Sequence, residues 1–151
     1  MNSNKKHIIL NVIFILLFSI YWESISTEFW VYNRERMGIF LLNHLPVIVL
    51  LYWMFVFFVS LFVSEKLYQI ITGKQEIPLF DKKLYVLDII SFGIIGTILE
   101  ALFHTLNWFE YNADLHWSLL PLINLPFNAI AGYFGVGMFI PTTMRYYRKH
   151  I

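Results

Sequence analysis

Four apolar stretches constrain this chain more than any other feature of its sequence. They cover residues 8–25, 38–63, 84–103 and 119–144. A helix needs about 20 apolar residues to cross the hydrocarbon core of a bilayer, and lipid offers an open strand no hydrogen-bond partners. We therefore expect an all-α membrane protein, with four transmembrane helices arranged as two hairpins in a single domain, residues 1–151.

The composition agrees with a lipid environment. Hydrophobic residues make up 58% of the chain and charged residues only 14%, whereas soluble domains have about 25% charged residues. The chain has no cysteine, which excludes disulfide and thiolate chemistry. The first apolar stretch resembles a signal peptide in its position, but it ends in Tyr21, Trp22 and Glu23 rather than in a small-residue cleavage site. We expect it to be retained as a helix.

The basic residues predict the orientation. Arg34 and Arg36 lie between the first and second stretches, whereas the other Lys and Arg residues flank the opposite helix ends: Lys5, Lys6, Lys66, Lys74, Lys82, Lys83, Arg145, Arg148 and Lys149. Because short cytoplasmic loops carry the excess of Lys and Arg, we expect both termini in the cytoplasm, in a bacterial or archaeal plasma membrane. The few basic residues sit where this rule needs them, so we expect no nucleic-acid partner.

Glu100 is an ionisable residue inside the third stretch, where a charge costs roughly 2.5–3.5 kcal/mol on insertion scales. His104 follows one helical turn later and is expected on the same face. Glu23 takes the corresponding place at the end of the first stretch. These three are the candidate catalytic residues, with Glu100 as general acid and His104 tuning it. The alternative is a buried pair that only stabilises the helix bundle.

A metal site is not expected. Such a site needs three or four donors, and helical carboxylate sites usually repeat a Glu–His motif. The first half offers Glu23 and Thr27 where the second offers Glu100 and His104.

The two halves of the chain, residues 8–63 and 84–144, resemble each other. The first half has Asn11, Glu23, Trp30, Tyr32, Asn33, Asn43, Leu45, Pro46 and Tyr52, and the second has Asp88, Glu100, Trp108, Tyr111, Asn112, Asn124, Leu125, Pro126 and Tyr133. This order indicates an internal repeat of two parallel hairpins, and chance similarity in a biased composition is the alternative. A repeat would place the two acids at similar depth.

Aromatic and amide residues complete the candidate site. We expect Trp30, Tyr32, Trp108 and Tyr111 to bind substrate beside the acids, although an aromatic belt at the headgroups would explain them equally. Two prolines are predicted inside the second and fourth helices, where each would free a backbone carbonyl. Asn43 and Asn124 lie just before these prolines and join the candidate substrate-binding residues.

Small residues indicate where helices pack closely. Gly93 and Gly96 lie in the third stretch, and Gly132, Gly135 and Gly137 lie in the fourth. Small residues let helix backbones approach each other in membranes. We read these glycines as structural.

The stretch Trp30-Val31-Tyr32-Asn33, followed by Gly38-Ile39, Leu45-Pro46 and an aromatic-rich run, resembles the membrane-integral lycopene cyclase family of carotenoid biosynthesis. The paired hairpins with intramembrane acids are also similar to carotenoid hydratases. The resemblance covers residues 23–63 and, more weakly, 100–137. It implies an enzyme that uses an intramembrane acid on an isoprenoid. The family follows its proline with an acidic pair, whereas Val47 and Ile48 follow Pro46 here.

Three functions fit the sequence. The first is an isoprenoid-modifying or carotenoid-modifying membrane enzyme of the cyclase or hydratase type. The second is a non-catalytic accessory or assembly protein of the membrane. The third is a small transporter coupled to protons or cations. We expect no cofactor, a membrane lipid or isoprenoid as ligand, and a homo-oligomer or a partner membrane subunit.

Overall fold

The computed structural model describes residues 3–41 and 43–150, so the ends of the predicted domain and residue 42 lie outside the described residues. The described chain is mostly helical. Its elements are α1 (Ser3–Ile25), β1 (Trp30–Tyr32), α2 (Arg34–Met37), β2 (Phe40–Leu41), β3 (Leu45–Pro46), α3 (Val47–Thr72), α4 (Lys82–Thr105), β4 (Phe109–Tyr111), the 3-10 turn η1 (Ala113–Leu115) and α5 (Phe127–His150).

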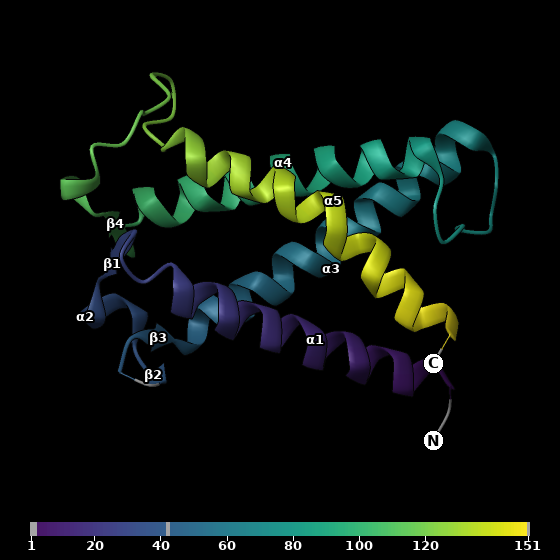
Figure 1. Ribbon diagram of the computed structural model, residues 1–151, viewed down its shortest axis with the longest axis horizontal. Coiled ribbons are helices and arrows are strands. Elements are labelled where there is room, and N and C mark those ends of the chain that lie inside the picture. The colour runs from purple at the N-terminus through teal and green to yellow at the C-terminus, as the bar shows by residue number, and fades with distance from the viewer. Residues whose placement is uncertain (1–2, 42, 151) are drawn as a thin grey trace.

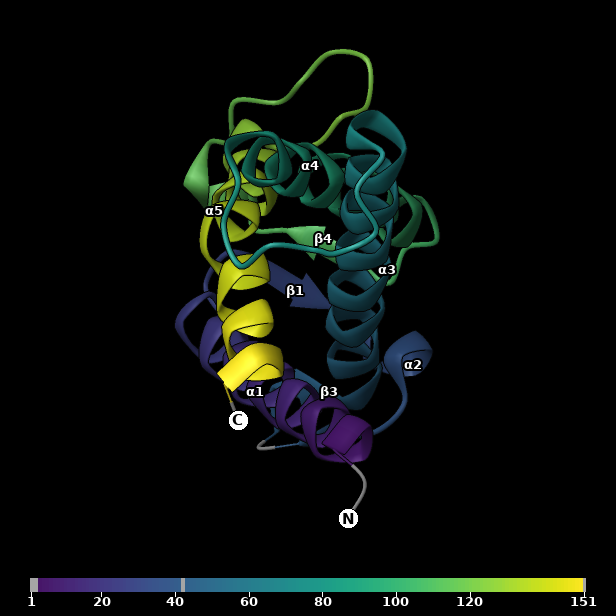
Figure 2. The same ribbon diagram turned by 90° about the vertical axis from the view of Figure 1, so that its right-hand side faces the viewer.

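Four long helices run between two unlike ends of the molecule. The short strands, α2 and the α4–α5 connection lie at one end, and both termini lie at the other end with the α3–α4 connection (Figures 1 and 2). Within the part of the chain that the structure describes, three helical segments are long and apolar enough to cross a membrane, namely His7–Ile25, Val47–Thr72 and Lys82–Thr105. The helix α5 is of similar length, but it falls outside that set.

The second and fourth helices begin later than the sequence predicts. The predicted helix 38–63 is α3, which starts at Val47 because Phe40–Leu41 and Leu45–Pro46 form the antiparallel pair β2–β3. It continues to Thr72 and ends where Gly73 adopts a left-handed conformation with φ of 70°. The predicted helix 119–144 is α5, which starts at Phe127 and continues to His150.

Pro46 and Pro126 therefore precede these helices, and the prediction that they lie inside them is wrong. Each helix begins at the residue after its proline. A proline at a helix start removes no intrahelical hydrogen bond and has its φ fixed near the helical value. The proline within α5 is Pro141.

The structure gives the two halves similar local geometry. The Asn33 and Asn112 side chains each accept a hydrogen bond from the backbone N–H two residues later. Asn43 and Asn124 both have positive φ, and Leu45 and Leu125 are both buried. The first backbone N–H of α3 donates to the Ile39 carbonyl, and the first backbone N–H of α5 donates to the Ser118 carbonyl. The strands β1 and β4 pair antiparallel across the halves, with Trp30 opposite Tyr111 and Tyr32 opposite Phe109.

Glycines set the close approach of α4 and α5. A Cβ atom on Gly96 would lie 2.2 Å from the Tyr133 ring, and one on Gly93 would lie 2.4 Å from the Phe134 ring. On the α5 side, a Cβ atom on Gly137 would lie 2.8 Å from a backbone atom of Ile89. These three glycines are structural, as expected. The same expectation is wrong for Gly135, because nothing lies within 4 Å of a Cβ atom built there. The missing side chains let aromatic rings of α5 lie directly against the α4 backbone.

A charged cluster ties three helices together near the ends that carry the termini. Arg145 of α5 donates to both carboxylate oxygens of Asp88 on α4, at 2.5 and 2.8 Å, and to Glu65 on α3 at 3.1 Å. Arg145 is 3% exposed and Asp88 is 1% exposed. Arg148 also pairs with Glu65. Arg145 and Asp88 form the buried centre of this ion-pair network, whereas Glu65 is partly buried and Arg148 is exposed. Removal of one partner of the buried pair would disrupt the network strongly.

Candidate functional site

A cavity of about 450 Å³ lies at the end of the molecule that carries the strands. Its volume is within the range of roughly 300–1,000 Å³ that is typical of ligand sites. Its lining residues come from all four long helices and from the segments that connect them. They are Trp22, Glu23, Phe29, Trp30, Tyr32, Val49, Tyr52, Trp53, Glu100, Phe103, Phe109, Tyr111, Leu115, His116, Trp117, Ser118, Asn128, Ala129, Gly132 and Tyr133.

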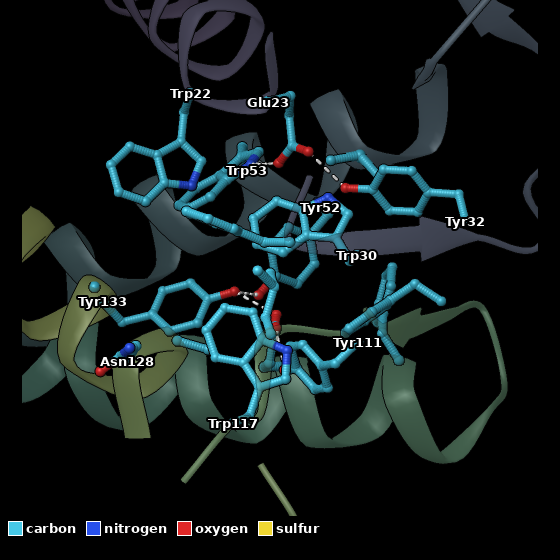
Figure 3. Close-up of a pocket in the computed structure, with 18 of the residues that line it drawn as sticks. Trp22, Glu23, Trp30, Tyr32, Tyr52, Trp53, Tyr111, Trp117, Asn128 and Tyr133 are labelled. Carbon is cyan, nitrogen blue, oxygen red and sulfur yellow. Dashed lines mark hydrogen bonds between the residues drawn. The ribbon is translucent and has the colours of Figure 1, made fainter. Parts of the chain in front are cut away.

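Glu23 enters the cavity from the last turns of α1 and is 3% exposed. The Trp53 indole N–H donates to its Oε1 atom at 2.8 Å, and the Tyr32 hydroxyl donates to its Oε2 atom at 2.5 Å. Figure 3 shows Tyr32 and Trp53 on either side of this carboxyl group. Each oxygen therefore has one neutral donor.

Glu100 enters the same cavity from α4 and is 7% exposed. The Tyr111 hydroxyl donates to its Oε1 atom at 2.6 Å, and the Tyr133 hydroxyl donates to its Oε2 atom at 2.6 Å. The Tyr133 hydroxyl also contacts the Tyr52 hydroxyl. Figure 3 shows Tyr111 and Tyr133 across the cavity from Glu23. The two acids thus face one chamber from different helices, each held by neutral groups.

The strand pair positions one donor for each acid. Tyr32 ends β1 and Tyr111 ends β4. The pairing is extended by the backbone N–H of Asn33, which donates to the Trp108 carbonyl, and by that of Asn112, which donates to the Phe29 carbonyl. The donors of Glu23 and Glu100 therefore belong to one hydrogen-bonded unit.

The two strand phenols remain protonated donors. Burial raises the pKa of Tyr32 and of Tyr111 well above the usual value, and the nearby glutamates raise the pKa of both further. A neutral hydroxyl can donate to a carboxylate, and it can also accept from a protonated carboxyl group. The arrangement therefore tolerates either protonation state of the acids.

His104 follows Glu100 one turn later on α4, but it is not a hydrogen-bond partner of that carboxyl group. The two Glu100 oxygens accept from Tyr111 and Tyr133 instead. Its ring instead lies 5.4 Å from the Tyr111 ring and 5.9 Å from the Phe109 ring. His104 is not a lining residue of the cavity. Its place is behind Tyr111, where it supports the ring of the donor.

The remaining predicted residues divide between the cavity and the turns. Trp30, Tyr32 and Tyr111 line the cavity, whereas Trp108 packs on Phe103 with ring centroids 4.3 Å apart. The two asparagines do not line it. Asn43 and Asn124 adopt φ of 63° and 54°, and the Asn43 carbonyl accepts from Arg34 at 2.6 Å. Both asparagines are turn residues, because asparagine tolerates the left-handed region.

Sequence reasoning missed three of the most buried members of the site. Tyr52, Trp53 and Tyr133 donate to the acids or to one another from the buried faces of α3 and α5. Tyr52 and Tyr133 occupy corresponding positions in the two halves, which was the available signal. Among residues 3–41 and 43–150, no group of three or more His, Asp or Glu side chains is placed to hold a metal ion.

Comparison of the chain with protein-family models, with curated proteins and with solved structures finds no significant match.

Proposed function

We propose that this protein is a membrane-embedded enzyme that protonates an isoprenoid or another unsaturated lipid. One observation carries the proposal: two buried carboxyl groups, Glu23 and Glu100, face a single aromatic cavity and are held only by neutral donors. A carboxyl group that keeps its proton in such a site can act as a general acid at neutral pH.

The chemistry follows from these groups. Glu100 transfers its carboxyl proton to one carbon of a C=C bond, which leaves a carboxylate and a carbocation on the neighbouring carbon. The faces of Trp30, Trp53 and Trp117 stabilise the cation through their quadrupoles. Glu23, as a carboxylate, then accepts a proton from a carbon beside the cation, which restores a C=C bond. If the chain cyclises before this last step, the product is a cyclic isoprenoid, as in a cyclase. If water adds to the cation instead, Glu23 accepts a proton from the resulting oxonium oxygen and the product is an alcohol, as in a hydratase.

Entry from the membrane is supported by the exposed lining residues. Phe29, Leu115, His116, Ser118 and Asn128 line the cavity and are exposed at the strand end of the molecule. They form a rim of mixed polarity, which suits a lipid that enters from the bilayer interface. A cavity of about 450 Å³ suits one end of a long isoprenoid chain better than a whole one.

The topology proposed here has four spanning helices, with α5 as the fourth. At about 1.5 Å per residue, its 24 residues are long enough for a core of about 30 Å. Both termini and the α3–α4 connection lie in the cytoplasm of a bacterial or archaeal cell, because that end carries most of the exposed basic residues.

Since the chain has no cysteine, the variants Gln75→Cys and Asp114→Cys test this orientation directly. An impermeant thiol reagent added to intact cells should label only the second.

We also propose that the two halves arose by duplication and that the active form is a homo-oligomer or has a partner membrane subunit. The paired geometry of the halves supports the duplication. Homologues in which the corresponding positions vary independently would contradict the duplication.

Many large apolar side chains on the long helices face outward, which leaves room for a second subunit. A fully active monomer in native mass spectrometry from nanodiscs would rule out the oligomer.

The proposed reaction is tested by deuterium incorporation. The purified protein in nanodiscs is incubated in deuterated buffer with acyclic isoprenoids of graded chain length, and the recovered lipids are analysed by mass spectrometry. We expect deuterium on carbon for at least one of them, and its loss in Glu100→Gln. Glu110→Gln is the matched control, because Glu110 is exposed on β4 beside Tyr111. The absence of carbon-bound deuterium with every isoprenoid would reject the enzyme and favour an accessory role.

A further inference from the structure

The described lining of the cavity has acidic side chains without basic side chains to match them. Two carboxylic acids line it, and none of its described lining residues is Lys or Arg. Its one histidine, His116, is exposed at the rim. The buried guanidinium of Arg145 lies on the other half of α5 and pairs with Asp88 and Glu65. When the acids ionise, nothing among the described lining residues compensates their charge.

The hydrogen bonds of the acids leave room for a cation. Each carboxyl oxygen of Glu23 and Glu100 has one protein donor, although a carboxylate accepts about four hydrogen bonds in all. All four donors are neutral hydroxyl or indole groups, so they orient the carboxylates without cancelling their charge. When the acids ionise, their negative charge is therefore held in place at the wall of the cavity.

Most of the remaining lining residues are aromatic. They include Trp22, Trp30, Trp53, Trp117 and Phe103. Aromatic faces attract cations through their quadrupoles, and cages of this kind are typical of quaternary ammonium recognition. A small inorganic cation is a poorer match, because Ca²⁺ takes about 6–8 oxygen ligands. An organic cation needs no such shell.

We propose that this cavity is a binding site for a lipophilic quaternary ammonium, whose cationic centre faces Glu23 and Glu100 and whose apolar arm lies among the aromatic side chains. This activity goes beyond the enzyme proposed above and does not require it. A protein that binds such cations without acting on isoprenoids would be a carrier or a receptor for them.

The test compares two molecules of the same shape. The probes are (phenylbutyl)trimethylammonium and its uncharged isostere, in which a carbon atom replaces the nitrogen. Binding to the protein in zwitterionic nanodiscs is followed by tryptophan fluorescence, with partitioning corrected in protein-free nanodiscs. We expect the ammonium to bind at least about tenfold more tightly than the isostere. Equal affinity for the two would overturn the proposal.

Variants test whether Glu23 and Glu100 cause the preference for the ammonium over its isostere. Glu23→Gln and Glu100→Gln should each reduce the preference for the ammonium, and the double variant should abolish it. Glu110→Gln should leave it unchanged, because Glu110 is exposed outside the cavity. A preference that survives in a folded double variant would place the cation elsewhere and overturn the site.

A second measurement uses the unaltered protein, in case the double variant does not fold. An apolar carbodiimide modifies buried carboxyl groups, and peptide mass spectrometry reports the modification at each glutamate. The ammonium should slow modification of Glu23 and Glu100 but not of Glu110, and the isostere should protect much less. Equal protection by both probes would contradict a charge-selective site. Because no catalysis is measured, this result is independent of the deuterium assay.

Discussion

Each buried acid depends on the side chains that donate to it. Tyr32 and Trp53 hold Glu23, and Tyr111 and Tyr133 hold Glu100. A buried polar group that loses its partner costs about 1–3 kcal/mol. The donors therefore contribute to stability as well as to the orientation of the carboxyl groups.

We predict that Tyr111→Phe lowers the free energy of unfolding by about 1–3 kcal/mol, because it leaves one oxygen of Glu100 without its donor while keeping the ring. Denaturant titration in mild detergent, followed by circular dichroism, measures this. Tyr21→Phe is the control, since Tyr21 is exposed on α1, and it should change stability by less than about 0.5 kcal/mol. Equal effects of the two substitutions would show that the hydroxyl of Tyr111 has no buried partner.

Alkaline pH should destabilise the fold through the same phenols. Burial raises the pKa of Tyr32 and of Tyr111, whereas in the unfolded chain tyrosine loses its proton near pH 10. Their contribution is thus fully present below about pH 10 and is lost above it, by up to about 1.4 kcal/mol per pH unit for each phenol. Stability measured from pH 8 to 11 should fall less steeply in Tyr111→Phe. Parallel curves would contradict the assignment.

The chemistry-bearing residues were partly predictable. Glu23, Glu100, Tyr32 and Tyr111 were selected from the sequence because acids and aromatics recur near the ends of the apolar stretches, and all four line the cavity. The spacing predicts that His104 acts directly on Glu100, whereas its ring lies against Tyr111, the donor to Glu100. Spacing along a helix places two residues on one face, but it does not say which neighbouring strand or helix supplies a better donor.

At the level of elements, the packing of α4 on α5 decides where the Tyr133 hydroxyl lies. The Tyr133 ring fills the space above Gly96, and its hydroxyl donates to Glu100 one helical turn further along α4. The helix contact and the acid site are therefore coupled. A larger residue at position 96 must displace the ring.

We predict that Gly96→Ala destabilises the protein by about 1–3 kcal/mol, the usual cost of overpacking, and reduces the deuterium incorporation proposed above. Gly135→Ala is the matched control, because nothing lies within 4 Å of a Cβ atom built there. It should be neutral or stabilising by up to about 1 kcal/mol, since alanine favours helix. Thermal unfolding of both variants measures the difference. A tolerated Gly96→Ala would mean that α4 and α5 are further apart.

Helix starts were the least predictable part of the elements. The apolar runs continue through the β2–β3 pair and through residues 119–126, so hydropathy alone could not separate hairpin from helix. Pro46 and Pro126 mark the starts of α3 and α5, whereas the sequence predicts both as kinks inside these helices. The β1–β4 pair joins segments that lie far apart in the sequence, with Trp30 opposite Tyr111. A local sequence pattern cannot predict a pairing between such distant segments.

At the scale of the whole molecule, the polar interior has two parts. The acid cavity lies at the strand end, and the Arg145 cluster lies toward the other end, joining α3, α4 and α5. The cluster is fully partnered, whereas the acids of the cavity are not paired with any cation among the described lining residues. This asymmetry separates a structural network from a site that is open to a ligand.

We predict that Arg145→Gln destabilises the fold by about 3–5 kcal/mol, because it leaves Asp88 buried without its cation. Lys149→Gln, at an exposed position of the same helix, should change little. Adding Asp88→Asn to Arg145→Gln should recover part of the loss, since the uncompensated charge is then removed. Denaturant titration of the wild type, Arg145→Gln, Asp88→Asn and the double variant completes a double-mutant cycle. Additive effects would show that the two residues do not interact.

Solid-state NMR of the protein in lipid bilayers tests the central feature most directly. With labelled glutamate, tyrosine and tryptophan, the carboxyl carbon of Glu100 should give cross-peaks to the rings of Tyr111 and Tyr133, and that of Glu23 to the rings of Tyr32 and Trp53. Cross-peaks from either carboxyl group to acyl chains or to bulk water, without those to its aromatic partners, would contradict the shared cavity.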